Sequence, residues 1–339
     1  MASLSARPAS RAVPLHRVDS LVPSEDLLPD VLPTERLTVS GKPVPAIRSE
    51  LRRIDNARNA GSVILCWVHA AATIGAAAWL ASPLGYALAV IMMGPVFARF
   101  AILGHEAAHK LLFTDKATND FVGKWLLASP AFVPFSLYRR SHFAHHKEEF
   151  GPNEPDLAFY VGYPVDRRRL RRRLVRDAVG ISGWKNLKAL LIALTKPAAR
   201  PVAMPIAWAQ LGLIAAFTTA GRPELYVLLW IVPWMTSWRV LNRLRAIAEH
   251  GGMEASKDRR RTTHHVRQSR LAGFWIVPFN TGWHLAHHVD MGVPWRNLPL
   301  LHEELVTAGW VVPQLEYPTY RSLWRDAASG TGGGGIMLP

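Results

Sequence analysis

The feature that most constrains the fold is the grouping of apolar residues into long runs. Two runs, at residues 61–82 and 86–103, are separated by a short Pro-Leu-Gly turn, and two more, at residues 203–220 and 224–241, flank a Gly-Arg-Pro turn. About 20 apolar residues suffice for a helix that crosses the hydrocarbon core of a bilayer. We therefore predict an all-α polytopic membrane protein with four transmembrane helices in two hairpins.

The basic residues give these helices an orientation. Of the 40 Lys and Arg residues, 38 lie in residues 1–60, 104–200 and 239–339, which four spans would put on one side of the bilayer. Lys and Arg concentrate in cytoplasmic segments, so we expect both termini and a helical cap to be cytosolic. The formal net charge of +15 could also indicate a nucleic-acid partner, but no nucleic-acid-binding motif accompanies it.

Composition divides the chain into three parts. Residues 1–55 are rich in Pro, Ser and charge and contain no run typical of a signal peptide, so we expect a flexible basic cytosolic arm. Residues 56–325 are the expected membrane domain, and residues 326–339 a flexible Gly-rich tail. Within the domain, residues 167–176 form an arginine-rich run with apolar residues at helical spacing. This pattern is typical of a helix on anionic headgroups, and docking of an acidic electron-donor protein is the alternative.

Histidine is the second informative residue type, because eight of the 14 histidines lie in three clusters. These are His105-Glu-Ala-Ala-His109, His142-Phe-Ala-His145-His146 and His284-Leu-Ala-His287-His288. Helix positions i, i+3 and i+4 share one face, and neutral imidazole is the commonest metal ligand. A lone histidine beside an apolar helix is usually a packing residue, but three clusters on one membrane face would crowd many imidazoles. The sequence therefore predicts a metal site.

The cysteine content limits the redox chemistry. Cys66 is the single cysteine and lies within an apolar run. It excludes disulfides within the chain, thiolate-ligated iron–sulfur clusters and Cys-rich zinc sites. Any electrons that the protein uses must come from outside.

The strings HEAAH, HFAHH and HLAHH, in this order, resemble the three histidine boxes of the membrane fatty acid desaturase and hydroxylase superfamily. The resemblance runs from about residue 61 to residue 302. It is especially close after the third box, where residues 293–299 read Val-Pro-Trp-Arg-Asn-Leu-Pro. His250, in Ala-Glu-His-Gly, is similar to the isolated histidine that follows the fourth span in this family.

The resemblance implies a cytosolic di-iron site with nine histidine ligands: His105, His109, His142, His145, His146, His250, His284, His287 and His288. It implies that O2 is the co-substrate and that a double bond is introduced into a fatty acyl chain of a lipid or acyl thioester. It also implies an external electron donor of the ferredoxin, rubredoxin or cytochrome b5 type. We expect no catalytic residues beyond the metal ligands, no further cofactor-binding residues, and a location in the bacterial inner membrane.

Other functions stay open. The same boxes serve hydroxylases and ketolases that act on carotenoids, alkanes or sterols. HEAAH also matches the H-E-x-x-H motif of zinc metalloproteases, with Glu106 as general base, although such a site needs only three protein ligands. A membrane protein that binds metal without catalysis is a further alternative.

Residues near the boxes have weaker assignments. Glu154 and Asp156 follow the second box, and we expect them to orient an imidazole rather than bind metal directly. Ala286 stands where Glu is common in the family, which we expect to alter hydrogen bonding around the ligands rather than metal binding. His264 and His265 lie in a basic stretch, where we expect a surface or interface role.

Overall fold

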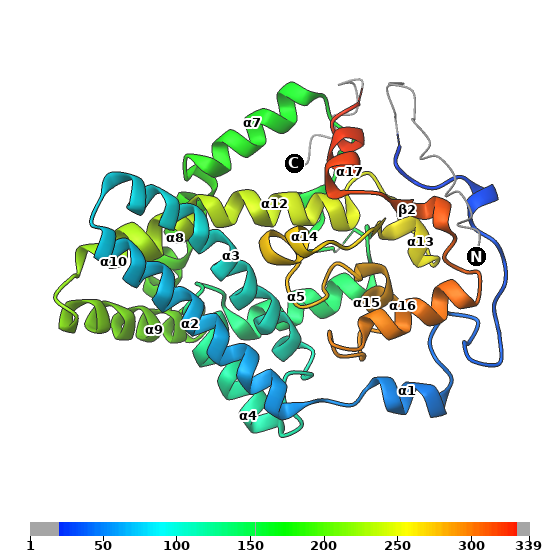
Figure 1. Ribbon diagram of the computed structural model, residues 1–339, viewed down its shortest axis with the longest axis horizontal. Coiled ribbons are helices and arrows are strands. Elements are labelled where there is room, and N and C mark those ends of the chain that lie inside the picture. The colour runs from blue at the N-terminus through cyan, green and yellow to red at the C-terminus, as the bar shows by residue number, and fades with distance from the viewer. Residues whose placement is uncertain (1–19, 153, 331–339) are drawn as a thin grey trace, which may run out of the picture.

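The computed structural model describes residues 20–152 and 154–330, and it is mainly helical (Figure 1). In this part of the chain, three helices are long and apolar enough to cross a membrane: α2 (Asn56–Leu80), α3 (Pro83–Ala108) and α9 (Arg200–Thr219). The first two form the first expected hairpin. Asp55 caps α2 by accepting from the Arg58 N–H, and Ser82 caps α3 by accepting from the Gly85 N–H.

The fourth apolar run does not form one continuous helix. It folds as α10 (Glu224–Tyr226), a π-helix η3 (Val227–Ile231) and α11 (Val232–Met235), and it continues after a break at Thr236 into α12 (Ser237–His250). Pro233 accounts for the irregularity, because proline lacks an N–H and its ring clashes with the carbonyl one turn earlier. The expected second hairpin thus has one regular helix, α9, and one interrupted helical path.

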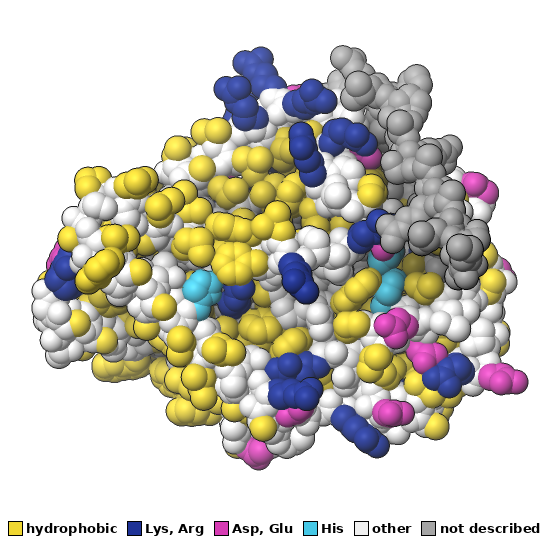
Figure 2. Space-filling view, viewed as in Figure 1, with side chains coloured by type: hydrophobic (Ala, Val, Ile, Leu, Met, Phe, Trp, Pro, Cys, Tyr) yellow, Lys and Arg dark blue, Asp and Glu magenta, His cyan; other side chains and the backbone are white. Residues whose placement is uncertain are grey.

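Apolar side chains on the outer helices remain exposed. Ile64, Leu65 and Trp79 of α2 and Trp208 and Leu211 of α9 are each more than half exposed. In Figure 2, hydrophobic side chains gather over the part of the molecule that contains α2, α3 and α10. Exposed apolar surface of this extent indicates contact with a membrane or partner. It fits the membrane association expected from the sequence.

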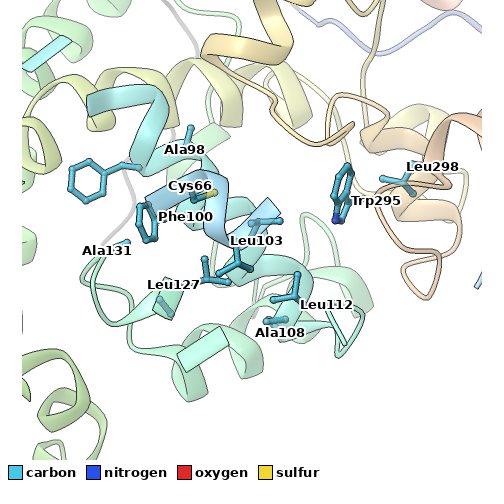
Figure 3. Close-up of a cluster of buried hydrophobic side chains, with 14 of the residues drawn as sticks. Cys66, Ala98, Phe100, Leu103, Ala108, Leu112, Leu127, Ala131, Trp295 and Leu298 are labelled. Atoms are coloured by element: carbon cyan, nitrogen blue, oxygen red, sulfur yellow. The ribbon is translucent and has the colours of Figure 1, made fainter. Parts of the chain in front are cut away.

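The core is built around α3, which packs against α2, α12 and the π-helix η2 (Val122–Ala128). Figure 3 shows part of it, with Phe100, Leu103 and Leu127 directed toward one another. Gly123 permits the close approach of η2, since a Cβ atom there would lie 2.4 Å from the Ala107 Cβ. Small residues at such contacts are typical of helices packed in membranes.

The remaining elements pack around this core, and most of them lie toward one end of α2 and α3 (Figure 1). They are η1 (Glu25–Leu27), α1 (Pro45–Leu51), α4 (Lys116–Phe121), α5 (Phe135–Lys147), α6 (Leu157–Tyr160), α7 (Arg167–Ala178), α8 (Ile181–Thr195), α13 (Arg259–Thr262), β1 (His265–Val266), α14 (Arg270–Trp275), α15 (His284–Val289), α16 (Leu298–Thr307), η4 (Pro313–Leu315), β2 (Glu316–Tyr317) and α17 (Tyr320–Ala327). Strands β1 and β2 pair in parallel, with His265 opposite Glu316.

The described part of the expected N-terminal arm packs against the domain, so for residues 20–55 the expectation of flexibility is wrong. Leu37 and Leu51 are buried, and Arg48 and Arg52 both donate to Asp290 at the end of α15. Burial of apolar side chains together with charge-assisted hydrogen bonds holds this segment in place. Residues 1–19 of the arm and residues 331–339 of the expected tail lie outside the described residues.

Candidate metal centre

Four helices supply the nine histidines predicted as ligands. His105 and His109 lie at the end of α3, the second box lies on α5, His250 is the last residue of α12, and the third box lies on α15. Eight of the nine are between 2% and 8% exposed, and His284 is slightly more so. The fold therefore brings residues that are far apart in the sequence to one buried place.

Five of the histidines form a first group: His105, His109, His142, His146 and His287, each offering a ring nitrogen within 4.8 Å of the others. The Nε2 atom of His142 lies 2.9 Å from that of His109 and 3.0 Å from that of His146. His287 Nε2 lies 3.0 Å from His146 Nε2. The Nε2 atoms of four of the five histidines thus converge.

The other four histidines form a second group. His145, His250 and His288 offer nitrogens within 4.8 Å of one another. His284 joins them, because its Nε2 lies 3.1 Å from that of His250 and 3.0 Å from that of His288. All nine predicted residues therefore belong to one of two neighbouring groups.

The spacing of these nitrogens fits a metal ion in each group. Two nitrogens that each lie about 2.1 Å from one ion, at right angles to each other, are about 3.0 Å apart. The Nε2 separations of 2.9–3.1 Å match this value. In addition, His105 Nδ1 is buried and has no hydrogen-bond partner among the described residues. A cation in each group would satisfy the converging lone pairs.

The second group is held by hydrogen bonds from its outer nitrogens. The Nδ1–H of His145 donates to Glu154 at 2.9 Å, that of His288 to Glu149 at 2.5 Å, and that of His250 to the Thr262 carbonyl at 2.8 Å. His284 Nδ1 lies 3.6 Å from Glu249. Each of the three hydrogen bonds to His145, His288 and His250 fixes the tautomer that leaves the Nε2 lone pair free for a metal.

The first group has a different environment. Within the described residues, no carboxylate accepts a hydrogen bond from any of its five histidines. Carboxylates raise the basicity of imidazole ligands. The two groups therefore differ in the number of histidines and in how strongly their imidazoles would donate to a metal.

Burial keeps most of these imidazoles neutral. It lowers the pKa of His142, His250, His287 and His288 well below the usual range, and the neighbouring histidines lower it further. His145 differs: burial opposes protonation, but the hydrogen bond to Glu154 and the charge of this carboxylate raise its pKa. Neutral imidazole is the form that binds metal.

Glu154 and Asp156, which follow the second box, differ, because the carboxylate of Asp156 lies within 4.8 Å of a His145 ring nitrogen but is not hydrogen-bonded to it. Glu154 contacts the outer nitrogen of His145, as expected of an orienting residue. Glu149, which sequence reasoning missed, does the same for His288 and also pairs with Arg259. The signal available was its place three residues after the second box, where an acidic side chain can turn back toward the ligands.

The expected surface role of His264 and His265 is wrong. They are 4% and 6% exposed. His264 Nε2 lies 2.7 Å from the Gly251 carbonyl oxygen, and His265 stacks on His302 with ring centroids 4.5 Å apart. Strand β2, from a distant part of the chain, covers them. Neither belongs to the two groups.

Glu106 does not occupy the position of a general base. Its carboxylate is buried and accepts a hydrogen bond from the Trp295 N–H at 3.1 Å. The protease alternative therefore lacks support from the geometry of the motif.

A cavity of about 270 Å³ adjoins both groups. His105 and His142 line it from the first group, and His145, His250 and His284 from the second. Apolar residues of α3 and α6 and a polar face of α12 complete its wall. A small organic molecule in this cavity would lie beside both candidate metal positions.

Comparisons with known proteins agree with this arrangement. The model of the family described as "Fatty acid desaturase" matches residues 47–323. The chain is similar to a dihydrorhizobitoxine desaturase from Bradyrhizobium elkanii, with 27% identity over 68% of each chain. It is also similar to an sn-1 oleoyl-lipid 12-desaturase from Arthrospira platensis, with 23% identity over 66% of this chain and 68% of that one. A chloroplastic omega-6 fatty acid desaturase from Spinacia oleracea is 23% identical, and the match spans 68% of this chain but 55% of the spinach protein.

Proposed function

Because the chain belongs to the fatty acid desaturase family, we propose that it is an O2-dependent di-iron oxidoreductase that introduces a double bond into a fatty acyl chain. The observation that carries this proposal is the pair of histidine groups, five and four residues, beside one cavity. Nitrogen-only shells of this kind suit a transition metal that keeps positions open for other ligands. Iron bound there would supply the O2-activating redox chemistry that oxidises an unactivated C–H bond.

The chain's own residues position the substrate and exclude water. The cavity wall places a bound molecule next to both groups, and Phe100, Phe159 and Trp238 provide apolar contacts for a hydrocarbon segment. Holding one C–H bond in place converts the oxidation into an effectively intramolecular step. Buried carboxylates, Glu149 and Glu154, hold the ligand rings in orientation.

The electrons come from a separate protein in this proposal, because Cys66 is the only cysteine and no flavin or heme motif accompanies the histidines. A donor of the ferredoxin, rubredoxin or cytochrome b5 type is consistent with the basic surface of the chain. Figure 2 shows Lys and Arg side chains along the edge formed by α7 and α17.

We also propose the four-span topology, with both termini and the histidine groups on the cytosolic side of a bacterial inner membrane. The distribution of Lys and Arg supports this orientation. The apolar surfaces of α2 and α9 support contact with lipid. The membrane domain would then extend over residues 56–325.

The test is lipid analysis of cells that express the chain, with the variant His287→Ala as control. Gas chromatography of fatty acid methyl esters should show new unsaturated products in cells that express the wild-type chain and none in cells that express His287→Ala. A new oxygen function would point to a hydroxylase or ketolase instead. The absence of any new product in iron-replete cells with a suitable donor would contradict the proposal.

A further inference from the structure

We propose that Arg239, Asn242 and Arg245 form an anion-binding site in the cavity, and that this site holds the carboxylate of an unesterified acid. This inference rests on the proposed function, because it names the form in which the acyl chain is presented. The substrate would be a free acid in place of a thioester or a lipid ester.

The three residues lie on one face of α12 at positions i, i+3 and i+6, and all three line the cavity. A helix rises about 1.5 Å per residue, so Asn242 and Arg245 precede His250 by about 12 and 8 Å along the axis. An anion between them would lie close to both histidine groups. The C–H bond that is oxidised would then lie several carbon atoms from the carboxylate of the substrate.

The donor groups of the two arginines are only partly matched by the described residues. The Nε atoms of Arg239 and Arg245 are buried and make no hydrogen bond with the described residues. Arg245 is partly matched, because it forms an ion pair with Glu249 in which Nε lies 3.3 Å from the carboxylate. Arg239 stacks on Trp234 at 4.1 Å and has no ion pair among the described residues. Buried donors normally have a partner, which points to a bound ligand.

A second reason comes from the position of Arg239 in the chain. It lies at the end of the fourth apolar run, where a charged side chain that faces the protein interior is costly to place. Charged residues of this kind commonly contact a ligand or an ion path. Asp177 attracts the charge of Arg239 from a distance, but this carboxylate is itself paired with Arg243.

The anion is best matched by a carboxylate. The guanidinium fork pairs with the two oxygens of a carboxylate or a phosphate. Asp156 and Glu249 also line the cavity and repel any anion, so they disfavour a singly charged carboxylate less than a doubly charged phosphate. The volume of about 270 Å³ is at the small end for ligand sites, which favours a small acid over a nucleotide-bearing thioester or a phospholipid headgroup at this position.

Binding to the purified, iron-loaded full chain in lipid nanodiscs tests this inference. The probes are octanoate, methyl octanoate and octyl phosphate, and the variants are Arg239→Gln and Asn242→Leu. We expect octanoate to bind at least tenfold more tightly than its methyl ester, and both variants to weaken octanoate at least tenfold without changing the ester. Arg172→Gln, an exposed arginine on α7, is the matched control and should leave all affinities unchanged.

Equal binding of octanoate and methyl octanoate, or octanoate binding that survives both variants, would overturn the inference. Tighter, Arg239-dependent binding of octyl phosphate would also overturn it, in favour of a phosphate-bearing substrate. If Arg239→Gln fails to fold, the uncharged substitution at Asn242 decides. If cells that express the chain make unsaturated products but the purified chain binds octanoate no better than methyl octanoate, only this inference fails. If the chain prefers octanoate but no unsaturated product forms in cells, the proposed function fails.

Discussion

At the scale of single residues, Glu149 links a ligand ring to the protein around it. It accepts from His288 and pairs with Arg259, and it is almost completely buried. We predict that Glu149→Gln lowers the metal affinity of the second group about 10- to 100-fold, because a hydrogen-bonded carboxylate orients the ring and strengthens it as a donor. Competition with a chelator measures the affinity. Glu148→Gln, an exposed neighbour, is the control and should bind metal like the wild type.

His250 and His264 provide a second comparison at this scale. His250 belongs to the second group, whereas the Nε2 atom of His264 is hydrogen-bonded to the Gly251 carbonyl and its ring packs against Tyr317. We predict that His250→Ala abolishes oxidation as severely as His287→Ala and lowers the iron content from two ions per chain to about one.

His264→Ala should instead keep two irons and most of the activity. It removes a buried hydrogen bond, so it should lower stability by about 1–3 kcal/mol. Metal analysis and thermal unfolding of both variants are the measurements. Loss of iron from His264→Ala with retention in His250→Ala would require a different ligand set.

At the scale of secondary-structure elements, the contact between α3 and η2 depends on a missing side chain. A Cβ at Gly123 would lie 2.4 Å from the Ala107 Cβ, whereas a Cβ at Gly212 on α9 meets nothing within 4 Å. We predict that Gly123→Ala destabilises the protein by about 1–3 kcal/mol through overpacking. Gly212→Ala should be neutral or slightly stabilising, because alanine favours helix. Unfolding of both variants in the same detergent measures the difference, and equal melting temperatures would contradict the packing argument.

The elements also show which features the sequence could predict. The histidine clusters were predictable because their spacing reflects local helix geometry. The burial of His264 and His265 was not, because a basic stretch gives no sign that residues 316–317 will pair with it. Likewise, the composition of residues 1–55 predicts a flexible arm, although Asp290, more than 200 residues away, pairs with Arg48 and Arg52. Local composition reports the polarity of a segment but not its distant partners.

At the scale of the whole molecule, the proposed topology can be tested by introducing one exposed cysteine per variant and labelling it. Cys66, the only native cysteine, is buried, so it should stay silent toward a membrane-impermeant maleimide. Glu224→Cys places a cysteine at the start of α10, just after the turn that follows α9, and Lys257→Cys places one after α12. Both positions are exposed. In intact spheroplasts we predict labelling at position 224 only, and labelling at 257 after the membrane is disrupted. The reverse pattern would invert the topology.

The candidate ligands lie on four helices, and the chain between the first and the last of them, His105 to His288, contains most of the domain. Bound metal would therefore cross-link the four helices and close several large loops of the chain at once. Closing these loops costs conformational entropy, which the chain regains when it unfolds. A ligand that binds only the folded state stabilises it in proportion to the logarithm of its concentration. The lifetime of this protein against proteolysis should therefore follow the iron supply of the cell, independently of whether any lipid is being oxidised.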